Sequence, residues 1–181
     1  MTKYIAILRG INVGGKRRLK MDDLKALFRD LGFSDVHTYI QSGNVIFNAS
    51  EKGSDTTISE KIEEAILQKY DFKVPVIVRT ASELKEAIAS NPFYTSGNEE
   101  VNRLHLTFLK IYPSAEGIEK ARSANYDPDD FKVSGKNVFL SCSGKYSDSK
   151  LSNTFFESKL KVPATTRNWK TVLKLGELID Q

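Results

Sequence analysis

The sequence predicts an α+β protein, in which a ferredoxin-like βαββαβ sandwich is followed by a second, related βαββα half with two C-terminal helices. Two observations predict this class. Short apolar runs alternate with segments whose apolar residues recur at helical spacing, and a glycine-containing turn separates the middle two strands of each half. A chain of 181 residues buries about 70% of its unfolded surface, so its core needs no metal or disulfide.

The first half is predicted as a domain of residues 1–93. The apolar run 4–8 ends at Arg9-Gly10 and predicts a buried strand, and the next helix begins at Met21 and stops at Gly32. Ser42-Gly43-Asn44 is a tight turn between two strands. Apolar spacing then predicts an amphipathic helix. The expected elements after the first helix are strands 36–41 and 45–48, helix 58–70, strand 75–79 and helix 81–89.

A polar, turn-rich stretch, residues 94–100, is the candidate linker to a second domain of residues 102–181. Packing of the two halves as one domain is the open alternative. The elements expected there are strand 104–111, helix 115–124, hairpin 131–140 and helices 151–160 and 168–179. Residues 134–139 resemble residues 42–47. Two interpretations stay open, an internal duplication or convergence on the same turn chemistry.

Charge is distributed unevenly along the chain. Residues 1–20 carry six lysines or arginines and no acid, whereas residues 21–100 carry eight basic and fourteen acidic residues. Clustered positive charge favours an anionic partner. No apolar run is long enough to cross a bilayer, so no membrane partner is expected. Cys142 is the single cysteine and no secretion signal precedes the first strand, which together favour a cytoplasmic location.

A basic, glycine-rich segment, residues 9–20, lies between the first strand and the first helix. Exposed backbone N–H groups and flexible glycines in such a place can hold an anion. The spacing Gly10 to Lys16 matches a phosphate-binding loop, but Arg17 stands where Ser or Thr would ligate Mg²⁺, which excludes the NTPase interpretation. The alternative is a sharp turn beneath solvated cations. The candidate ligand-binding residues of this segment are Arg9, Gly10, Asn12, Gly14, Gly15 and Lys16.

Two further segments carry candidate ligand-binding residues. Gln41, Ser42 and Asn44 place amide and hydroxyl groups at a hairpin tip. In a ferredoxin-like sheet the third strand lies between the first and second, so the carboxyl ends of those two strands share one edge. The basic segment and this turn should therefore meet.

The last candidate segment is residues 165–170, which we expect to open the final helix with Thr166, Arg167 and Asn168 as a second anion site. Trp169 is expected to belong to the core, because it lines up with apolar residues of that helix. His37 and His105 are isolated and Cys142 is a typical packed cysteine, so neither a metal nor another cofactor is expected, and no catalytic residue is assigned.

Three stretches together resemble one known family. They are YIAILRGINVGGK from Tyr4, YIQSGNVIF from Tyr39 and SKLSNTFFESKLKVPATTRNWKTVLK from Ser149, and they resemble the bacterial Domain of Unknown Function 1697 family over essentially the whole chain. The resemblance implies an α+β architecture with a ferredoxin-like portion. It supplies no catalytic residues, and it suggests that the three candidate segments form one surface.

The sequence therefore predicts a bacterial protein that binds an anion through its basic segment. One alternative is a nucleic-acid-binding protein, because ferredoxin-like sheets serve many RNA-binding modules. Another is an enzyme that acts on a small phosphorylated or carboxylated metabolite, and a purely structural role is also open. The ligand, the reaction and the oligomeric state are not specified by the sequence.

Overall fold

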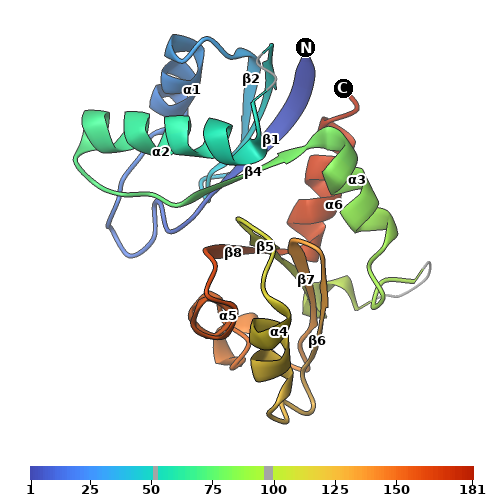
Figure 1. The fold of residues 1–181 in the computed structure, drawn as a ribbon. Helices are drawn as coiled ribbons and strands as arrows, with labels where there is room; N and C mark the ends of the chain where they lie inside the picture. The colour runs from blue at the N-terminus through green and yellow to red at the C-terminus, as the bar shows by residue number, and fades with distance from the viewer. Residues whose placement is uncertain (51–52, 96–99) are drawn as a thin grey trace. The chain divides into compact units, whose positions relative to one another are not determined.

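The computed structural model describes residues 1–50, 53–95 and 100–181, and within them it confirms the α+β class. These residues form two four-stranded antiparallel sheets and six α-helices (Figure 1). The chain divides into two compact units. Unit 1 comprises Met1–Lys85 and Glu177–Gln181, and unit 2 comprises Glu86–Gly176. The predicted domain limits, 1–93 and 102–181, stay a prediction, and of the candidate linker, residues 96–99 lie outside the described residues.

Unit 1 is built on a sheet with the strand order β2-β3-β1-β4. Strand β3 pairs antiparallel with both β1 and β2. The carboxyl ends of β1 and β2 therefore share one edge of this sheet, as expected. The elements that begin in unit 1 are β1 (Thr2–Leu8), α1 (Met21–Asp30), β2 (Ser34–Tyr39), β3 (Asn44–Ala49), α2 (Asp55–Tyr70), β4 (Val76–Thr80) and α3 (Ala81–Ala89). Helix α3 continues into unit 2, because unit 1 ends at Lys85.

The core of unit 1 lies between this sheet and helices α1 and α2, which cover one of its faces (Figure 1). Alternate residues of β1, Tyr4, Ala6 and Leu8, belong to this core together with Phe28 of α1 and Ile62 of α2. Each large apolar side chain buried there stabilises the fold by about 1.5–3 kcal/mol. Alternate side chains of a strand lie on opposite faces of its sheet, so these three residues of β1 lie on the face that the two helices cover.

Unit 2 is built on a second sheet with the strand order β6-β7-β5-β8. Its core includes residues from β5, β7, α4 and α5. Short 3₁₀ turns, Val101–Arg103 and Tyr146–Asp148, precede β5 and follow β7. The main elements are β5 (Leu104–Leu109), α4 (Ala115–Arg122), β6 (Asp130–Ser134), β7 (Asn137–Ser141), α5 (Asn153–Leu160), β8 (Ala164–Asn168) and α6 (Trp169–Leu178).

Strand β8 corrects the predicted second half. Residues 165–168 do not open the last helix; they pair antiparallel with β5, and α6 begins at Trp169. The βαββα half is thus completed by a fourth strand before its last helix. The sequence ATTRN lacks the apolar alternation that marks a half-buried strand, and Thr and Asn are typical of helix starts, so the pattern was ambiguous.

The two units repeat the same backbone contacts at the same positions. The N–H of Leu8 donates to the carbonyl of Gly43 over 2.9 Å, and the N–H of Leu109 donates to the carbonyl of Lys136 over 2.9 Å. One residue later, the N–H groups of Arg9 and Lys110 donate to the carbonyls of Pro75 and Pro163, each over 2.9 Å. The sheet edges after β1 and β5 are therefore equivalent, and the chain segments that leave them can be compared directly.

Candidate functional site

The basic segment 9–20, called the arm from here on, is a short hairpin that leaves the edge of the unit 1 sheet. Val13 forms an antiparallel bridge with Lys16, whose N–H donates to the Val13 carbonyl over 3.1 Å. Between them Gly14 and Gly15 have φ of +59° and +73°. A two-residue turn with positive φ at both central positions favours glycine strongly. The two glycines thus make a turn, and the arm presents cations through its side chains.

Asn12 fixes the arm to the β2–β3 turn. Its side-chain amide donates to the carbonyls of Leu19 and Gln41, over 2.9 Å each, and its Oδ1 accepts the N–H of Leu19 over 2.8 Å. Asn12 also has a φ of +55°, which asparagine tolerates better than most residues. The arm and the turn that contains Gln41 therefore meet, although 29 residues separate Asn12 from Gln41.

Gly43 is the second contact between the arm and this turn. It has a φ of +84°, and a Cβ atom built on it would lie 2.6 Å from Ile11 Cδ1 and 2.9 Å from Leu8 Cβ. Ile11 and Leu19, at the two ends of the arm, are almost fully buried. These two side chains consequently pack the base of the arm, whereas residues 13–18 at its tip are all exposed.

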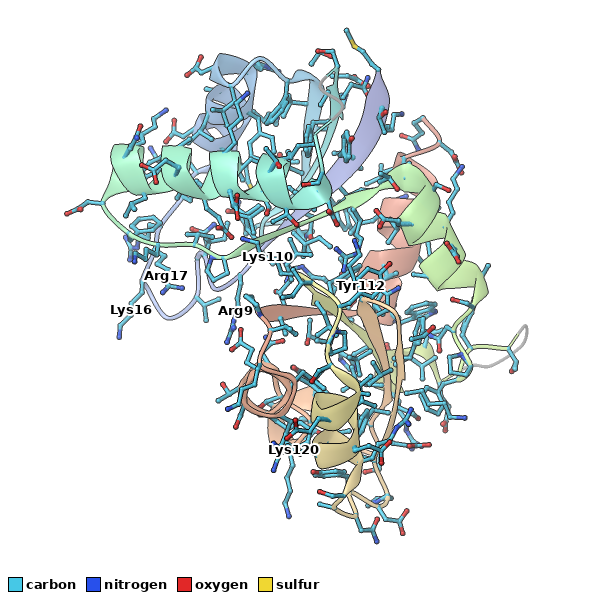
Figure 2. All side chains as sticks on the ribbon, viewed as in Figure 1. Arg9, Lys16, Arg17, Lys110, Tyr112 and Lys120 are labelled. Atoms are coloured by element: carbon cyan, nitrogen blue, oxygen red, sulfur yellow. The ribbon has the colours of Figure 1, made fainter. Side chains whose placement is uncertain are left out.

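Four cations are exposed on the arm, namely Lys16, Arg17, Arg18 and Lys20. Within the part of the chain that the structure describes, no carboxylate oxygen lies within 4.0 Å of their side-chain nitrogens. Figure 2 shows Lys16 and Arg17 at the outer end of the arm and Arg9 nearer its base. The Arg17 guanidinium lies beside Gly10, where an added Cβ would be 3.1 Å from Nη1. The charge of these side chains is therefore directed to solvent.

A cleft of about 610 Å³ lies beside the arm. Arg18 and Lys20 give it positive charge, and Asp23 of the first turn of α1 opposes them with one carboxylate. Gln41 is exposed at its border. The residues that line the cleft are Asn12, Gly15, Arg18, Leu19, Lys20, Asp23 and Gln41.

Ser42 and Asn44 serve the turn itself. Asn44 has no exposed surface, and its amide donates to the Tyr39 carbonyl over 3.0 Å and to Ser42 Oγ over 3.2 Å. Of the three predicted residues in this turn, Gln41 is the one that both is exposed and borders the cleft.

The predicted residues Thr166, Arg167 and Asn168 lie in unit 2. Thr166 Oγ1 shares hydrogen bonds of 2.7 Å with Thr107 Oγ1 and with Asn153 Oδ1, and Asn168 Oδ1 accepts the N–H of Thr171 over 2.8 Å, which caps α6. The single surface expected from all three segments stays a prediction, since this one belongs to the other unit.

Arg167 is buried at the end of β8. Its Nη1 donates to Thr165 Oγ1 and to the Thr166 carbonyl. Burial lowers the pKa of Arg167 to about 10, so it keeps its charge at neutral pH. Trp169 next to it is fully buried, which confirms its expected place in the core.

Sequence reasoning did not select several residues that the geometry brings forward. Arg17, Arg18 and Lys20 belong to the exposed arm, and the absence of acids from residues 1–20 was the signal for them. Arg79 is buried in β4 at the position equivalent to Arg167, and its Nη1 donates to the Val78 carbonyl over 2.9 Å. The available signal was an arginine at the last position but one of the fourth strand of each half, β4 and β8.

Among the described residues, no group of three or more His, Cys, Asp and Glu side chains is arranged to hold a metal ion. No helix in that part of the chain has the length and apolar character needed to span a membrane.

Fold and site together define an α+β protein of two equivalent units, one of which carries a basic arm at its sheet edge. The chain belongs to the family described as "Protein of unknown function (DUF1697)", whose model matches residues 1–139, and this confirms the resemblance seen in the sequence. A similar solved structure is that of the conserved bacterial protein SP0830 from Streptococcus pneumoniae, with 25% identity, 98% of each chain covered and a TM-score of 0.75. No curated protein matches the chain.

Proposed function

We propose that the arm binds the phosphate groups of a polyanion, and that the best-fitting ligand of this kind is nucleic acid. The observation that carries the proposal is the set of four exposed cations, Lys16, Arg17, Arg18 and Lys20, with no carboxylate oxygen within 4.0 Å among the described residues. Ordinary surface cations are commonly paired or interspersed with acids. A cluster of one sign focuses the potential and attracts an extended anion.

The fixed base of the arm supports this proposal. Asn12 and Gly43 hold the arm in one place before a ligand arrives, so binding has little backbone ordering to oppose it. Backbone phosphates of nucleic acid release condensed counterions when lysine or arginine neutralises them, which drives association at low salt. A protruding basic hairpin is well suited to follow such a chain of phosphates.

A second candidate is binding of a small phosphorylated or carboxylated metabolite, as an enzyme would do. The cleft beside the arm favours it, because Arg18, Lys20 and Gln41 converge there. Guanidinium and amide groups are suitable for one phosphate or carboxylate and its neighbouring oxygen atoms.

Finer features of the fold are proposals as well. We propose that each unit is a ferredoxin-like sandwich, and the equivalent strand orders β2-β3-β1-β4 and β6-β7-β5-β8 support it. A bacterial, cytoplasmic protein is the proposed setting, with a single, buried cysteine in support.

The decisive experiment measures the binding of labelled oligonucleotides by fluorescence anisotropy at salt concentrations from about 50 to 200 mM. The triple variant Lys16→Ala/Arg17→Ala/Arg18→Ala should lower the slope of log K against log salt by about 2–3, because each phosphate contact contributes roughly 0.7–0.9. The matched control Arg29→Ala/Lys69→Ala/Lys73→Ala removes three exposed cations from the helix-bearing part of the same unit. It should leave the slope unchanged.

Two results would overturn the polyanion proposal: no binding at low salt, or the same loss in both triple variants. The metabolite candidate is tested by thermal shift with nucleotides and phosphorylated metabolites. A ligand at one hundred times its Kd stabilises the protein by about 2.7 kcal/mol. That gain should disappear in Arg18→Ala if the cleft is the site.

A further inference from the structure

Unit 2 has its own segment at the sheet edge that corresponds to the base of the arm. Residues 110–114 follow β5 as the arm follows β1, and the N–H of Lys110 donates to the Pro163 carbonyl as that of Arg9 donates to the Pro75 carbonyl. The segment is short and carries no glycine turn. Its most exposed side chain is an aromatic ring, Tyr112, whereas the exposed side chains of the arm are mostly cations.

Among the described residues, Tyr112 is the most exposed aromatic side chain, with 71% of its area open to solvent, and Ile111 beside it is 48% exposed. A large apolar ring in such a position contributes little to the core. Figure 2 shows Lys110 and Tyr112 on the segment that leaves β5. The ring therefore has a face that another molecule can cover.

The β6–β7 turn supports the Tyr112 ring. The Lys136 ammonium nitrogen lies 5.6 Å from the ring centroid, and a Cβ on Gly135 would lie 3.7 Å from Tyr112 Cε1. Gly135 has a φ of +57°, so the turn is of the kind that favours glycine. The ring is thus held against a turn with Lys136 beside it, and Lys110 lies two residues before Tyr112 in the chain.

We propose that Tyr112 stacks on a base of a single-stranded nucleic acid while Lys110 and Lys136 contact the adjoining phosphates. This proposal rests on the proposed function of the arm, and it names the single strand as the ligand class. Every base has a flat face that stacks on an aromatic ring, and basic side chains beside that ring attract the backbone. In a duplex the bases are already stacked and paired, so this site selects single strands.

The experiment compares one labelled single strand with the duplex of the same sequence, at two salt concentrations. Tyr112→Ala should weaken binding of the single strand by about 5- to 100-fold, the range for loss of one stacked base. It should leave duplex affinity and the salt slope unchanged. Tyr112→Phe keeps the ring and should bind as the natural protein does. Ile111→Ala removes exposed apolar surface without a ring and should also bind normally.

Each remaining result overturns the stacking proposal. Equal affinity of Tyr112→Ala and the natural protein for the single strand excludes stacking. A loss in Ile111→Ala as large as in Tyr112→Ala indicates an apolar contact, such as a protein partner would make. Loss of stability is separated from loss of binding by measuring the unfolding midpoint of each variant.

Failure of this proposal and failure of the arm's function give different results. If the arm triple variant has the lower salt slope and Tyr112→Ala does not weaken single-strand binding, the arm proposal stands and the stacking proposal fails. If Tyr112→Ala weakens binding and the arm variant does not, the arm proposal fails while the stacking contact stands. Absence of any binding at low salt overturns both.

Discussion

The two units share one arrangement of sheet and helices, called the frame from here on. They differ in the chain segment that leaves the sheet edge after the first strand of each unit. In unit 1, twelve residues connect β1 to α1, and in unit 2 five residues connect β5 to α4. The backbone hydrogen bonds at the base of both connections are the same. Because the frame persists while the connection changes in length, charge and aromatic content, the frame determines the fold and the connections carry the proposed binding groups.

The likeness of the frames extends to side chains inside each unit. Glu63 of α2 accepts the N–H of Val76, the first residue of β4, over 2.8 Å, and Glu157 of α5 accepts the N–H of Ala164, the first residue of β8, over 3.1 Å. A serine is the N-cap residue of both helices, Ser54 before α2 and Ser152 before α5. These equivalences lie outside the hairpin turns, so they favour an internal duplication over convergence of turn chemistry.

The largest expected effect distinguishes the two hairpin glycines. Gly43→Ala combines an unfavourable positive φ with a Cβ that collides with Ile11 and Leu8, and should lower the free energy of unfolding by about 2–4 kcal/mol. Gly135→Ala has the same backbone problem but an ordinary contact with Tyr112, and should cost about 1 kcal/mol. Urea unfolding followed by circular dichroism measures both.

Equal destabilisation by these two substitutions would contradict the expected difference between the two hairpin turns. It would mean that the packing of the arm on the β2–β3 turn contributes nothing beyond the turn conformation. A Gly43→Ala variant with normal stability would also remove the argument that the arm has a fixed base.

A smaller effect is expected from the anchor of the arm. Asn12→Ala leaves the Leu19 N–H and the carbonyls of Leu19 and Gln41 without their partner, and should cost about 1–3 kcal/mol. It should also weaken binding of oligonucleotides, because a mobile arm must be ordered by the ligand. Anisotropy and urea unfolding measure the two effects separately. Asn48→Ala serves as the control, because the Asn48 amide of the same unit makes only a long, 3.5 Å contact with Asp35 Oδ2. Unchanged affinity in Asn12→Ala would show that the arm needs no anchor.

The smallest effect concerns pH and belongs to unit 2. His105 is buried against the Tyr146 ring, and burial lowers the pKa of His105 below its ordinary value of 6.5, opposed by its hydrogen bond to the Arg103 carbonyl. The folded state then binds fewer protons than the unfolded state as pH falls below 6.5. Stability contributed by neutral His105 is full above that pH and is lost on acidification through the lower folded value.

His105→Phe keeps a ring against Tyr146 and should flatten this dependence. The measurement is the urea unfolding midpoint at pH 7.5 and pH 5.5, roughly one unit either side of the ordinary histidine pKa. Unfolding is monitored by the fluorescence of Trp169, which lies in unit 2. The equivalent residue of β1 is Tyr4, so unit 1 has no histidine at this position. An equally steep dependence in His105→Phe would assign the effect to other groups.

Most of the frame could be predicted from the sequence because its signals are local. The apolar run of residues 4–8 predicted β1, helical spacing predicted α1 and α2, and turn glycines predicted both hairpins. Strand β8 could not be predicted, because its residues are polar and its pairing with β5 depends on a partner about sixty residues away. Propensity describes neighbours in sequence, whereas this strand is specified by tertiary pairing.

The positive charge of the candidate site could be predicted from the sequence, but the contacts that hold the arm in place could not. The count of cations in residues 1–20 identified the arm, yet the roles of its polar residues depended on distant groups. The amide of Asn12 holds Leu19 and Gln41 while the residue also lines the cleft, so ligand binding by Asn12 stays a prediction. The glycines suggested a backbone cradle, and their positive φ values give a tight turn.

The return of Glu177–Gln181 to unit 1 has a consequence for how the chain is made and labelled. Lys3 Nζ donates to the Ile179 carbonyl over 3.0 Å, and Lys85 pairs with Asp180, so residues from both sides of unit 2 in the sequence close unit 1. During synthesis residues 1–85, which contain the core between the unit 1 sheet and helices α1 and α2, leave the ribosome before unit 2 does. That core can therefore form first, whereas the contacts of Lys3 and Lys85 with Ile179 and Asp180 form last, and a label at Gln181 would report on this closing segment.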